Sequence, residues 1–318
     1  MREVIKAAKL QPGDTVGVIA PASCGDFDKI LVAARFFEGL GLRVRLGDAV
    51  RQQRGYLAGT DRERARDLHC MFADKEVKAV FCARGGYGTG RIADLLDYEL
   101  IRANPKIFWG YSDITFLHAA IFQRTGLVTF HGPMLTSDIA ADDVHPLTLA
   151  TFQQLFDPQP LRYDDTIAPL RVLAEGEATG RVVGGNLSLL VSTVGTPFEI
   201  DTTGKLLFIE EVDEEPYRVD RMLNQLRMAG KLDAAAGIVL GDFHNCDPVK
   251  RKEASLTLEE VFDDYLTPAG KPVLAGFRIG HCSPNLAIPL GAMGRIDTKE
   301  KTFTIVEPGV TDGPAAGE

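Results

Sequence analysis

Residues 107–122 read IFWGYSDITFLHAAIF, an apolar run that turns at Gly110-Tyr111-Ser112 into a segment with helical spacing. The first part has the length and character of a buried strand, and residues 114–122 repeat apolar side chains as the buried side of a helix does. A strand followed at once by a helix is the repeating unit of a parallel α/β sheet. This stretch therefore predicts the fold class.

The same alternation extends to both sides of this stretch. Asp26 could cap the first of the expected helices, and Gly39 or Gly41 could end it. The expected strands are 16–19, 44–46, 77–82, 107–111 and 128–130, and the expected helices are 27–40, 61–73 and 114–122. Strands alternating with helices of this length predict a parallel sheet that is covered by helices on both faces.

The alternation of strands and helices becomes irregular after residue 133. The second half of the chain contains more segments with the pattern of a β-strand. Its expected strands are 170–173, 180–183, 206–209, 238–240, 287–290 and 303–306, and its expected helices are 187–194, 217–228 and 258–265. The segment before them has prolines that suit a connection, and the last ten residues have almost no apolar side chain. We therefore expect an N-terminal domain at 1–140, a linker at 141–168, a β-rich domain at 169–308 and a flexible tail at 309–318.

Composition limits the class of protein. The chain has 318 residues, 45% hydrophobic and 25% charged, which is typical of about two globular domains. Its net charge of -9 disfavours general binding to nucleic acid or to an anionic membrane. No run reaches the ~18 apolar residues of a spanning helix, and the polar start predicts no signal peptide. Five scattered cysteines without CxxC spacing indicate a reduced, cytoplasmic protein.

Ser112 lies where the strand 107–111 ends and a helix begins. A nucleophile on such a turn has its oxygen exposed at the carboxyl edge of the sheet, and the backbone amides that follow point to where an oxyanion would form. The G-x-S-x-G pattern of the α/β-hydrolases is not met, because residue 114 is Ile. Local sequence favours the alternative that Ser112 or Asp113 only caps the helix.

A glycine-rich segment, RGGYGTGR, occupies residues 84–91 directly after the strand 77–82. Its four glycines let the backbone approach a ligand closely, as in phosphate loops and oxyanion holes. It lacks the GK[ST] of a P-loop, and it follows the third strand rather than the first, where a dinucleotide fingerprint normally lies. A tight turn without function and an NAD-dependent oxidoreductase are the alternatives.

Residues 206–217 read LLFIEEVDEEPY, with five carboxylates after a buried strand. Four of them suit a solvated loop, whereas Glu210 directly continues the apolar run and is the type of group that orients an imidazole. A structural ion pair is an equal alternative for Glu210. His281 lies in the loop IGHCSPN at 279–285, where a histidine is more often hydrogen-bonded or exposed than catalytic.

Ser112, Glu210 and His281 together supply a nucleophile, an orienting carboxylate and a base. His131 and His244 also lie at strand ends and compete for the role of base. These histidines could instead form a metal site with a carboxylate, but no HxH or HExxH spacing supports one.

These segments, in this order, resemble the LD-carboxypeptidase family, serine peptidases that trim murein peptides. The matching stretches are GVIAPAS, RGGYGTGR, GYSDIT, HGPM, GGNLSLL, LLFIEEVDEEPYRVDRML and GHCSPNLAIPLG, spread over nearly the whole chain. The resemblance implies a Rossmann-like N-terminal domain with a parallel sheet, a smaller β-rich α/β C-terminal domain, a site between them and a homodimer. It implies no metal and no organic cofactor.

The resemblance also implies a Ser–His–Glu triad. Glu210 matches the first acidic residue of the family's Ile-Glu-Asp step, and Glu211 stands at the position that differs, so which of the two orients the histidine is left open. The implied catalytic residues are Ser112, Glu210 and His281, the oxyanion-hole residues are Gly86 and Asp113, and the substrate-binding residues are Arg84, Gly85 and Tyr87.

Two activities occur in the family that the chain resembles. One removes the terminal D-alanine of cytoplasmic murein tetrapeptides, and the other, of the microcin-immunity type, cleaves a peptidyl–nucleotide conjugate and stacks its base on an aromatic residue, typically Trp. The only tryptophan, Trp109, is expected on a buried strand, which favours the murein activity. Arg84 and Arg91 are candidates to bind the substrate's terminal carboxylate. A non-catalytic peptide-binding protein is the alternative from another class.

Overall fold

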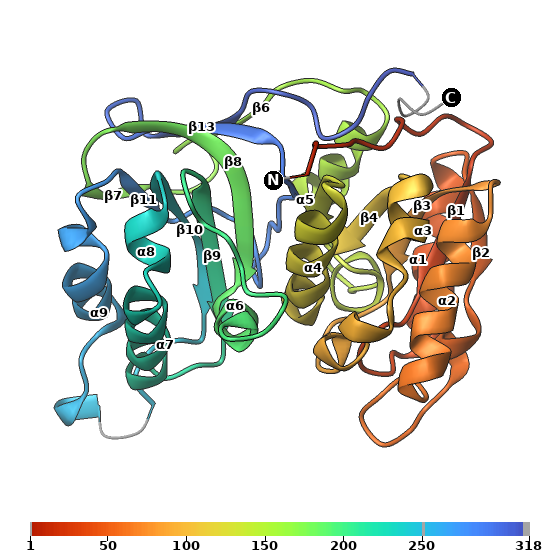
Figure 1. Cartoon of the computed structure of the whole chain (residues 1–318), viewed down its shortest axis with the longest axis horizontal. Coiled ribbons are helices and arrows are strands. Elements are labelled where there is room, and N and C mark those ends of the chain that lie inside the picture. The colour runs from red at the N-terminus through yellow and green to blue at the C-terminus, as the bar shows by residue number, and fades with distance from the viewer. Residues whose placement is uncertain (1, 250–251, 314–318) are drawn as a thin grey trace. The chain divides into compact units, whose positions relative to one another are not determined.

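A computed structural model describes residues 2–249 and 252–313 and divides the chain into two compact units (Figure 1). Unit 1 comprises the described residues up to Gln159, the segment Ser283–Gly291 and the chain from Pro308 onward. Unit 2 comprises Pro160–Cys282 and Ala292–Glu307. The chain thus returns to unit 1 late in the sequence, which the expected order of consecutive domains did not include.

Unit 1 is built on a six-stranded sheet. Its strands are β1 (Thr15–Ile19), β2 (Arg43–Leu46), β3 (Val77–Cys82), β4 (Ile107–Gly110), β5 (Thr129–His131) and β12 (Ile288–Leu290). Their order is β12-β5-β4-β3-β1-β2, with β1 to β5 parallel and β12 antiparallel to β5. The order 2-1-3-4-5 has a topological switch point between β1 and β3, where open α/β sheets bind ligands.

Helices cover both faces of this sheet, as the sequence predicted. They are α1 (Phe27–Gly39), α2 (Asp61–Ala73), α3 (Tyr98–Ala103), α4 (Thr115–Thr125) and the short α5 (Pro146–Ala150). Helices α2, α3 and α4 lie side by side on one face (Figure 1), and α1 packs on the other. Asp26 caps α1 by accepting from the amides of Asp28 and Lys29, and Thr60 and Glu63 form a reciprocal capping box on α2.

An aromatic core fills the face under α1. The ring of Trp109 on β4 stacks on Phe130 and Phe152 with centroid distances of 5.6 and 4.6 Å, and its Nε1 donates to the carbonyl of Pro133 at 2.7 Å. The preceding side chain of the strand, Phe108, points to the opposite face, where its ring lies 6.4 Å from that of Phe72 on α2, because side chains alternate along a strand. Trp109 is therefore a fully buried core residue, in agreement with the sequence analysis.

Three segments differ from the expected domain boundaries. Within the expected linker, α5 and the 3-10 turn Thr151–Leu155 belong to unit 1, because Phe152 is part of its core. The strand expected at 287–290 lies in unit 1 as β12 rather than in the C-terminal domain. In the expected tail, Val310 is buried and residue 311 pairs with residue 8, whereas 314–318 lie outside the described residues.

Unit 2 contains an eight-stranded sheet in the order β6-β14-β13-β8-β9-β10-β11-β7. Its strands are β6 (Leu161–Tyr163), β7 (Arg171–Ala174), β8 (Glu177–Asn186), β9 (Leu206–Val212), β10 (Gly237–His244), β11 (Val273–Ala275), β13 (Met293–Asp297) and β14 (Thr302–Ile305). Its helices are α6 (Leu187–Thr193), α7 (Pro216–Met228), α8 (Lys231–Ala234) and α9 (Leu258–Tyr265). Strands β8 to β11 are parallel and the other pairings are antiparallel, so the carboxyl ends of four strands share one edge.

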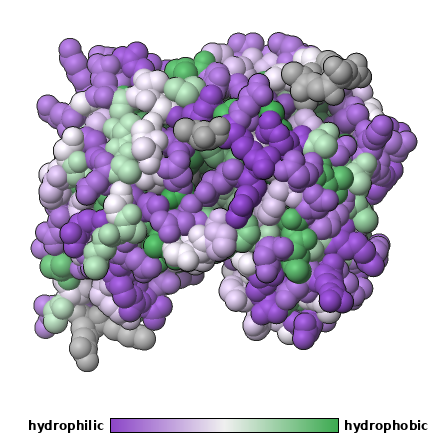
Figure 2. All heavy atoms as spheres, viewed as in Figure 1, coloured by the Kyte–Doolittle hydropathy of each residue, from purple (hydrophilic) through white to green (hydrophobic). Residues whose placement is uncertain are grey.

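The surface is mainly polar on the face shown in Figure 2, where hydrophobic residues form scattered patches. Strongly exposed large apolar side chains include Tyr56, Tyr87, Tyr217 and Met228. Within residues 2–249 and 252–313, no helix combines the length and the apolar character needed to span a bilayer.

Candidate active site

Ser112 occupies a strained turn between β4 and α4. Tyr111 is extended, and Ser112 has a φ of +63°, which residues other than glycine rarely adopt. Residues Ser112–Ile114 form a 3-10 turn, and the residue that caps α4 is Ile114, without a side-chain hydrogen bond. The helix-capping role that local sequence favoured for Ser112 or Asp113 is therefore wrong. A non-glycine residue held at positive φ is typical of functional sites.

The glycine-rich loop after β3 packs directly against this turn. A Cβ built on Gly85 would lie 2.9 Å from the Cβ and 3.1 Å from the Oγ of Ser112, so a larger residue would press on the serine. The same position is 3.3 Å from the amide nitrogen of Asp113. Gly86 has a φ of +98° and packs on Ser23, and its amide donates no hydrogen bond to another residue that the structure describes. Backbone amides thus lie close to the serine.

Buried polar groups fasten the loop in place. The carboxylate of Asp113 accepts from the amide of Thr89 at 2.9 Å, and the Thr89 hydroxyl donates to the carbonyl of Asp113 at 2.5 Å. Burial raises the pKa of Asp113, against the hydrogen bonds from Thr89 that lower it. The fully buried Arg64 donates to the carbonyls of Pro21 and Gly88. The loops after β1 and β3 are therefore held together beside the switch point.

His118 of α4 fixes the strand that leads into the serine. Its Nε2 lies 2.8 Å from the carbonyl of Gly110, and its Nδ1 lies 2.9 Å from the hydroxyl of Thr129. Burial lowers the pKa of His118 to about 4, so the ring is neutral at neutral pH. Because a carbonyl only accepts, Nε2 carries the proton and Nδ1 accepts from Thr129. The sequence analysis did not select His118, since a histidine on a buried helical face is typical of a core position.

In unit 2, Glu210 and His281 form a hydrogen-bonded pair. The Nδ1 of His281 lies 2.6 Å from Oε2 of Glu210, which is fully buried on β9, while the His281 side chain is 18% exposed. Gly280 has a φ of +122°, and a Cβ there would lie 2.7 Å from the same carboxylate oxygen. The glycine therefore lets the histidine loop approach the end of β9. Two of the residues that the sequence analysis selected are brought together in this way.

Glu211, the neighbouring carboxylate, has a different role. Its oxygens accept a hydrogen bond from the side-chain amide of Asn186 at 2.7 Å. They also accept from the backbone amides of Ser188 at 2.8 Å and of Val212 at 2.9 Å. Burial raises the pKa of Glu211, and the hydrogen bonds from Ser188 oppose this shift. Glu211 thus holds the start of α6, and of the two adjacent glutamates it is Glu210 that faces the histidine.

The competing histidines lie elsewhere. His131 is buried on β5 of unit 1, where its ring meets Tyr111 at a centroid distance of 5.6 Å. His244 is half exposed on β10, 3.8 Å from Asp242, whose pKa is raised by burial and lowered by Arg278. Within the two described stretches, no three His, Cys, Asp or Glu side chains lie together as metal ligands do. The alternative metal site has no counterpart in this part of the chain.

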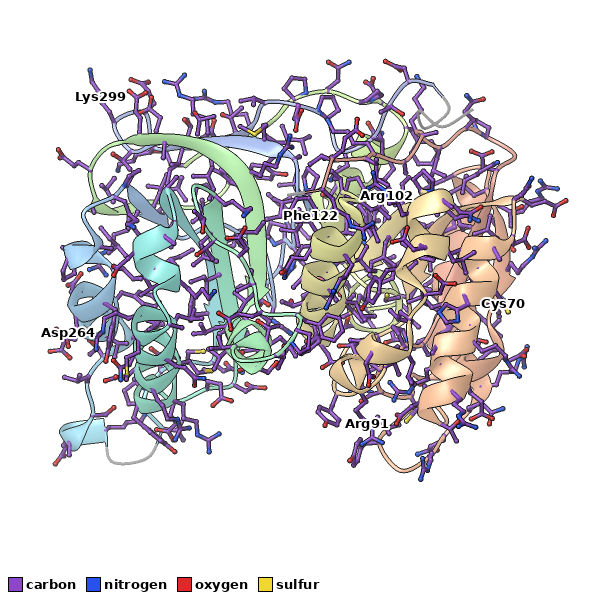
Figure 3. All side chains as sticks on the ribbon, viewed as in Figure 1. Cys70, Arg91, Arg102, Phe122, Asp264 and Lys299 are labelled. Carbon is purple, nitrogen blue, oxygen red and sulfur yellow. The ribbon has the colours of Figure 1, made fainter. Side chains whose placement is uncertain are left out.

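The two candidate arginines differ in their partners. Arg91 binds Asp61 through two hydrogen bonds of 2.9 and 2.8 Å and projects from the lower end of unit 1 (Figure 3). Arg84 is exposed and donates to the carbonyl of Cys24 at 3.2 Å. Tyr87, also on the glycine-rich loop, is 52% exposed. Arg91 therefore forms a structural ion pair with a carboxylate. Arg84 contacts only a backbone carbonyl, so its positive charge is the better candidate to bind an anionic substrate.

Comparisons with known proteins identify the family of the chain. The family model described as the LD-carboxypeptidase N-terminal domain matches residues 16–132, and the model of the LD-carboxypeptidase C-terminal domain matches residues 179–296. The chain is 63% identical over 308 residues to a probable murein peptide carboxypeptidase of Bacillus subtilis, covering 97% of this chain and 96% of the relative.

Two further relatives extend the comparison. A murein tetrapeptide carboxypeptidase of Pseudomonas aeruginosa is 34% identical over 290 residues, covering 88% of this chain and 92% of the relative. The solved structure of MccF in complex with glutamyl sulfamoyl guanosine matches with a TM-score of 0.86 and 27% identity, covering 96% of this chain and 99% of that chain. The similarity thus spans both units.

Proposed function

Because the chain belongs to the LD-carboxypeptidase family of serine peptidases, we propose that it hydrolyses the amide bond to the terminal D-alanine of murein tetrapeptides. The observation that carries the proposal is the 2.6 Å hydrogen bond between His281 and Glu210. A buried carboxylate on Nδ1 keeps the proton on that nitrogen, so Nε2 can accept one. The names of the B. subtilis and P. aeruginosa relatives supply the substrate class.

In the proposed mechanism, Ser112 is the nucleophile and His281 is the general base. His281 takes the hydroxyl proton as the Ser112 oxygen attacks the carbonyl carbon, and the amides of Gly86 and Asp113 hold the oxyanion. The proton then passes to the leaving amine of D-alanine, and the C–N bond breaks. Water, activated by the same imidazole, hydrolyses the acyl-enzyme. Each step uses groups of the protein and water, without a metal or cofactor.

Chain connectivity supports the pairing of Ser112 with His281. The segment that follows His281 belongs to unit 1, where the Asn285 side chain donates to Asp138 at 3.2 Å. The same carboxylate oxygen accepts from the hydroxyl of Tyr111, the residue before Ser112, at 3.3 Å. Asn285 lies only four residues after His281 in the chain, and the proposed pairing rests on this short connection.

The remaining substrate contacts are proposed from exposure and charge. Gly85 shapes the space around the serine, Tyr87 lines it, and Arg84 binds the terminal carboxylate of the peptide. We further propose that the enzyme acts in the cytoplasm as a homodimer, as the family resemblance implies. Light scattering of the purified chain tests the dimer, and cell fractionation tests the location.

A second candidate is the cleavage of a peptidyl–nucleotide conjugate, favoured by the structural similarity to MccF. Against it, Trp109 is fully buried and hydrogen-bonded, so it is unable to stack on a nucleobase. Membership of a peptidase family argues against both an oxidoreductase and a protein that only binds peptides.

Mass spectrometry of the protein incubated with murein tetrapeptide tests the proposal, with Ser112→Ala as the control. We expect the wild type to release one alanine and the variant to be slower by a factor on the order of 10⁴ or more. Equal cleavage by both proteins would exclude Ser112 as the nucleophile. If neither protein cleaves the tetrapeptide but the wild type cleaves a peptidyl–nucleotide conjugate, the second candidate replaces the first.

A further inference from the structure

Strand β10 of unit 2 has a bulge directly opposite Glu210. The register of β10 against β9 shifts here, so that two residues of β10, Gly241 and Asp242, face the single position of Glu210. Bulges of this kind re-aim side chains and are frequent next to active sites. The bulge therefore places Asp242 beside the strand position whose carboxylate binds His281.

The same bulge holds the backbone of the loop that carries His281. The amide of Asp242 donates to the carbonyl of Ile279, two residues before the histidine, at 3.0 Å. A Cβ built on Gly241 would lie 2.3 Å from that carbonyl oxygen, so the loop and the bulge are in direct backbone contact. Because the backbone of Asp242 makes this contact, its side chain is available for another role.

The side chain of Asp242 makes electrostatic contacts around the Glu210–His281 pair. Its Oδ1 accepts from the guanidinium of Arg278 at 3.3 Å, and its Oδ2 lies 3.8 Å from Nδ1 of His244. Burial raises the pKa of Asp242, and the positive charge of Arg278 lowers it. The charge of Glu210 also raises this pKa, and that of His281 lowers it, so the Asp242 carboxylate interacts with both members of the pair.

The charge of Glu210 has few hydrogen-bond donors around it. Its Oε1 is buried and accepts no hydrogen bond from a residue that the structure describes, while Oε2 binds His281. Where water and donors are scarce, the protonation of an imidazole depends strongly on neighbouring charges. The charged or titratable side chains that interact at this place in unit 2 include Glu211 of β9, Asp242 and His244 of β10, and Arg278 of the histidine loop.

We propose that Asp242 and Arg278 are positioning residues for His281: their ion pair holds the histidine loop on β10 and balances the charge beside the imidazole. The inference rests on the proposed function, in which His281 is the general base. Asp242 favours the imidazolium that forms when the base takes the proton of Ser112, and Arg278 opposes it. Because the two charges are paired, their effects nearly cancel, and the resting imidazole stays available as a base.

The pH dependence of kcat/KM for D-alanine release tests this balance, because it reports the ionisation of the base in the free enzyme. Asp242→Asn removes a negative charge, so the rise in activity with pH should move to lower pH by about 0.5 to 1 unit. Arg278→Gln should move it to higher pH by a similar amount, at the low end for a neighbouring charge because solvent reaches the ion pair. The double variant should lie close to the wild type.

Controls separate charge balance from support of the loop. Arg278→Lys keeps the positive charge and should leave the pH profile in place. Asp263→Asn breaks a similar ion pair elsewhere in unit 2, 3.2 Å from Arg171, and should leave it in place as well. A pair that only supports the loop would lower kcat in both single variants without moving the profile. Profiles that stay fixed, or that move in the same direction in both single variants, would overturn the proposal.

An NMR titration that needs no turnover separates this inference from the proposed function. The chain has six histidines, and the imidazole signal that His281→Gln removes is that of His281. In Ser112→Ala protein, we expect Asp242→Asn to lower the titration midpoint of this signal and Arg278→Gln to raise it. Such opposite shifts support the charge balance even if the enzyme cleaves no murein peptide. Midpoints that do not move would overturn the inference even if the peptidase is active.

Discussion

Replacing Gly85 by Ala tests the nucleophile through packing rather than by removing it. Gly85 does not have a positive φ, so alanine is compatible with its backbone. The added Cβ would lie 2.9 Å from the Cβ of Ser112, about 0.5 Å inside ordinary van der Waals contact. The serine, the loop or both must move by that amount to relieve the overlap.

The size of the effect follows from this displacement. A misplacement of about 1 Å at a reacting atom costs on the order of 10²-fold in rate, so a shift of about half that size predicts a loss of about 10- to 100-fold in kcat. This loss equals about 1.4 to 2.7 kcal/mol of transition-state stabilisation. Overpacking also lowers the free energy of unfolding by about 1 to 3 kcal/mol, and this change is measured separately by denaturant titration.

The assay is steady-state release of D-alanine, together with the rate of labelling of Ser112 by a fluorophosphonate. We expect kcat and the labelling rate to fall together, because both need the serine oxygen in one position. Gly39→Ala is the matched control: Gly39 ends α1, a Cβ there meets nothing within 4 Å, and the variant should keep full activity. If Gly85→Ala folds and keeps its activity within twofold of the wild type, the reasoning that places the reacting atom at Ser112 is refuted.

Four further changes separate the roles of neighbouring residues. Glu210→Gln should lower kcat by about 10³- to 10⁴-fold with little loss of stability, because the His281 tautomer is no longer held; a loss below tenfold contradicts the assignment. Glu211→Ala should instead destabilise the fold by about 2 kcal/mol, measured by urea unfolding, since it removes the carboxylate that accepts hydrogen bonds from the Asn186 side chain and from the half-buried Ser188. For His118, the pKa is about 4 when folded and 6.5 when unfolded, so the unfolded chain takes up a proton first as the pH falls and the stability declines from pH 6.5 toward pH 4. His118→Gln should remove about 2 kcal/mol of this decline at pH 5, and parallel stability curves for variant and wild type would contradict it. Thr60→Ala should lower the free energy of unfolding by about 1 kcal/mol through loss of the capping box on α2 while kcat is unchanged; an altered kcat would link that cap to the site.

The sequence predicted the parallel sheet of unit 1 well, because its strands are short apolar runs and its helices carry caps that are local signals. The expected helix at 61–73 and strand at 77–82 have the observed bounds. The sheet to which a later strand belongs was harder to predict. Residues 287–290 have a clear strand pattern, but periodicity does not reveal the partner, and the antiparallel pairing with β5 places them in the earlier sheet. The segment 141–168 looked like a linker because it has prolines, whereas Phe152 packs into the aromatic core.

The residues of the candidate site also divide into those that local sequence identifies and those that only a contact between distant residues identifies. Glu210 could be separated from the other acidic residues because it continues an apolar strand, and His281 could not be separated from His244 or His131 by any local pattern. The contact that distinguishes it, 2.6 Å to Glu210, joins residues that are 71 positions apart. His118 gave no signal at all, because the Gly110 carbonyl it contacts belongs to the backbone.

Both halves of the candidate site hold the reactive side chain by the same means, a glycine whose missing Cβ leaves the space that the side chain occupies. Gly85 faces Ser112 in unit 1, and Gly280 faces Glu210 in unit 2. A hydrogen bond fixes a side chain by occupying one of its polar atoms, and a nucleophile or a base needs those atoms for the reaction. Contact with a backbone limits the positions of the side chain and leaves its lone pairs available. Alanine at Gly85 would therefore press on the nucleophile, and alanine at Gly280 would press on Glu210 and also strain a backbone that has a φ of +122°.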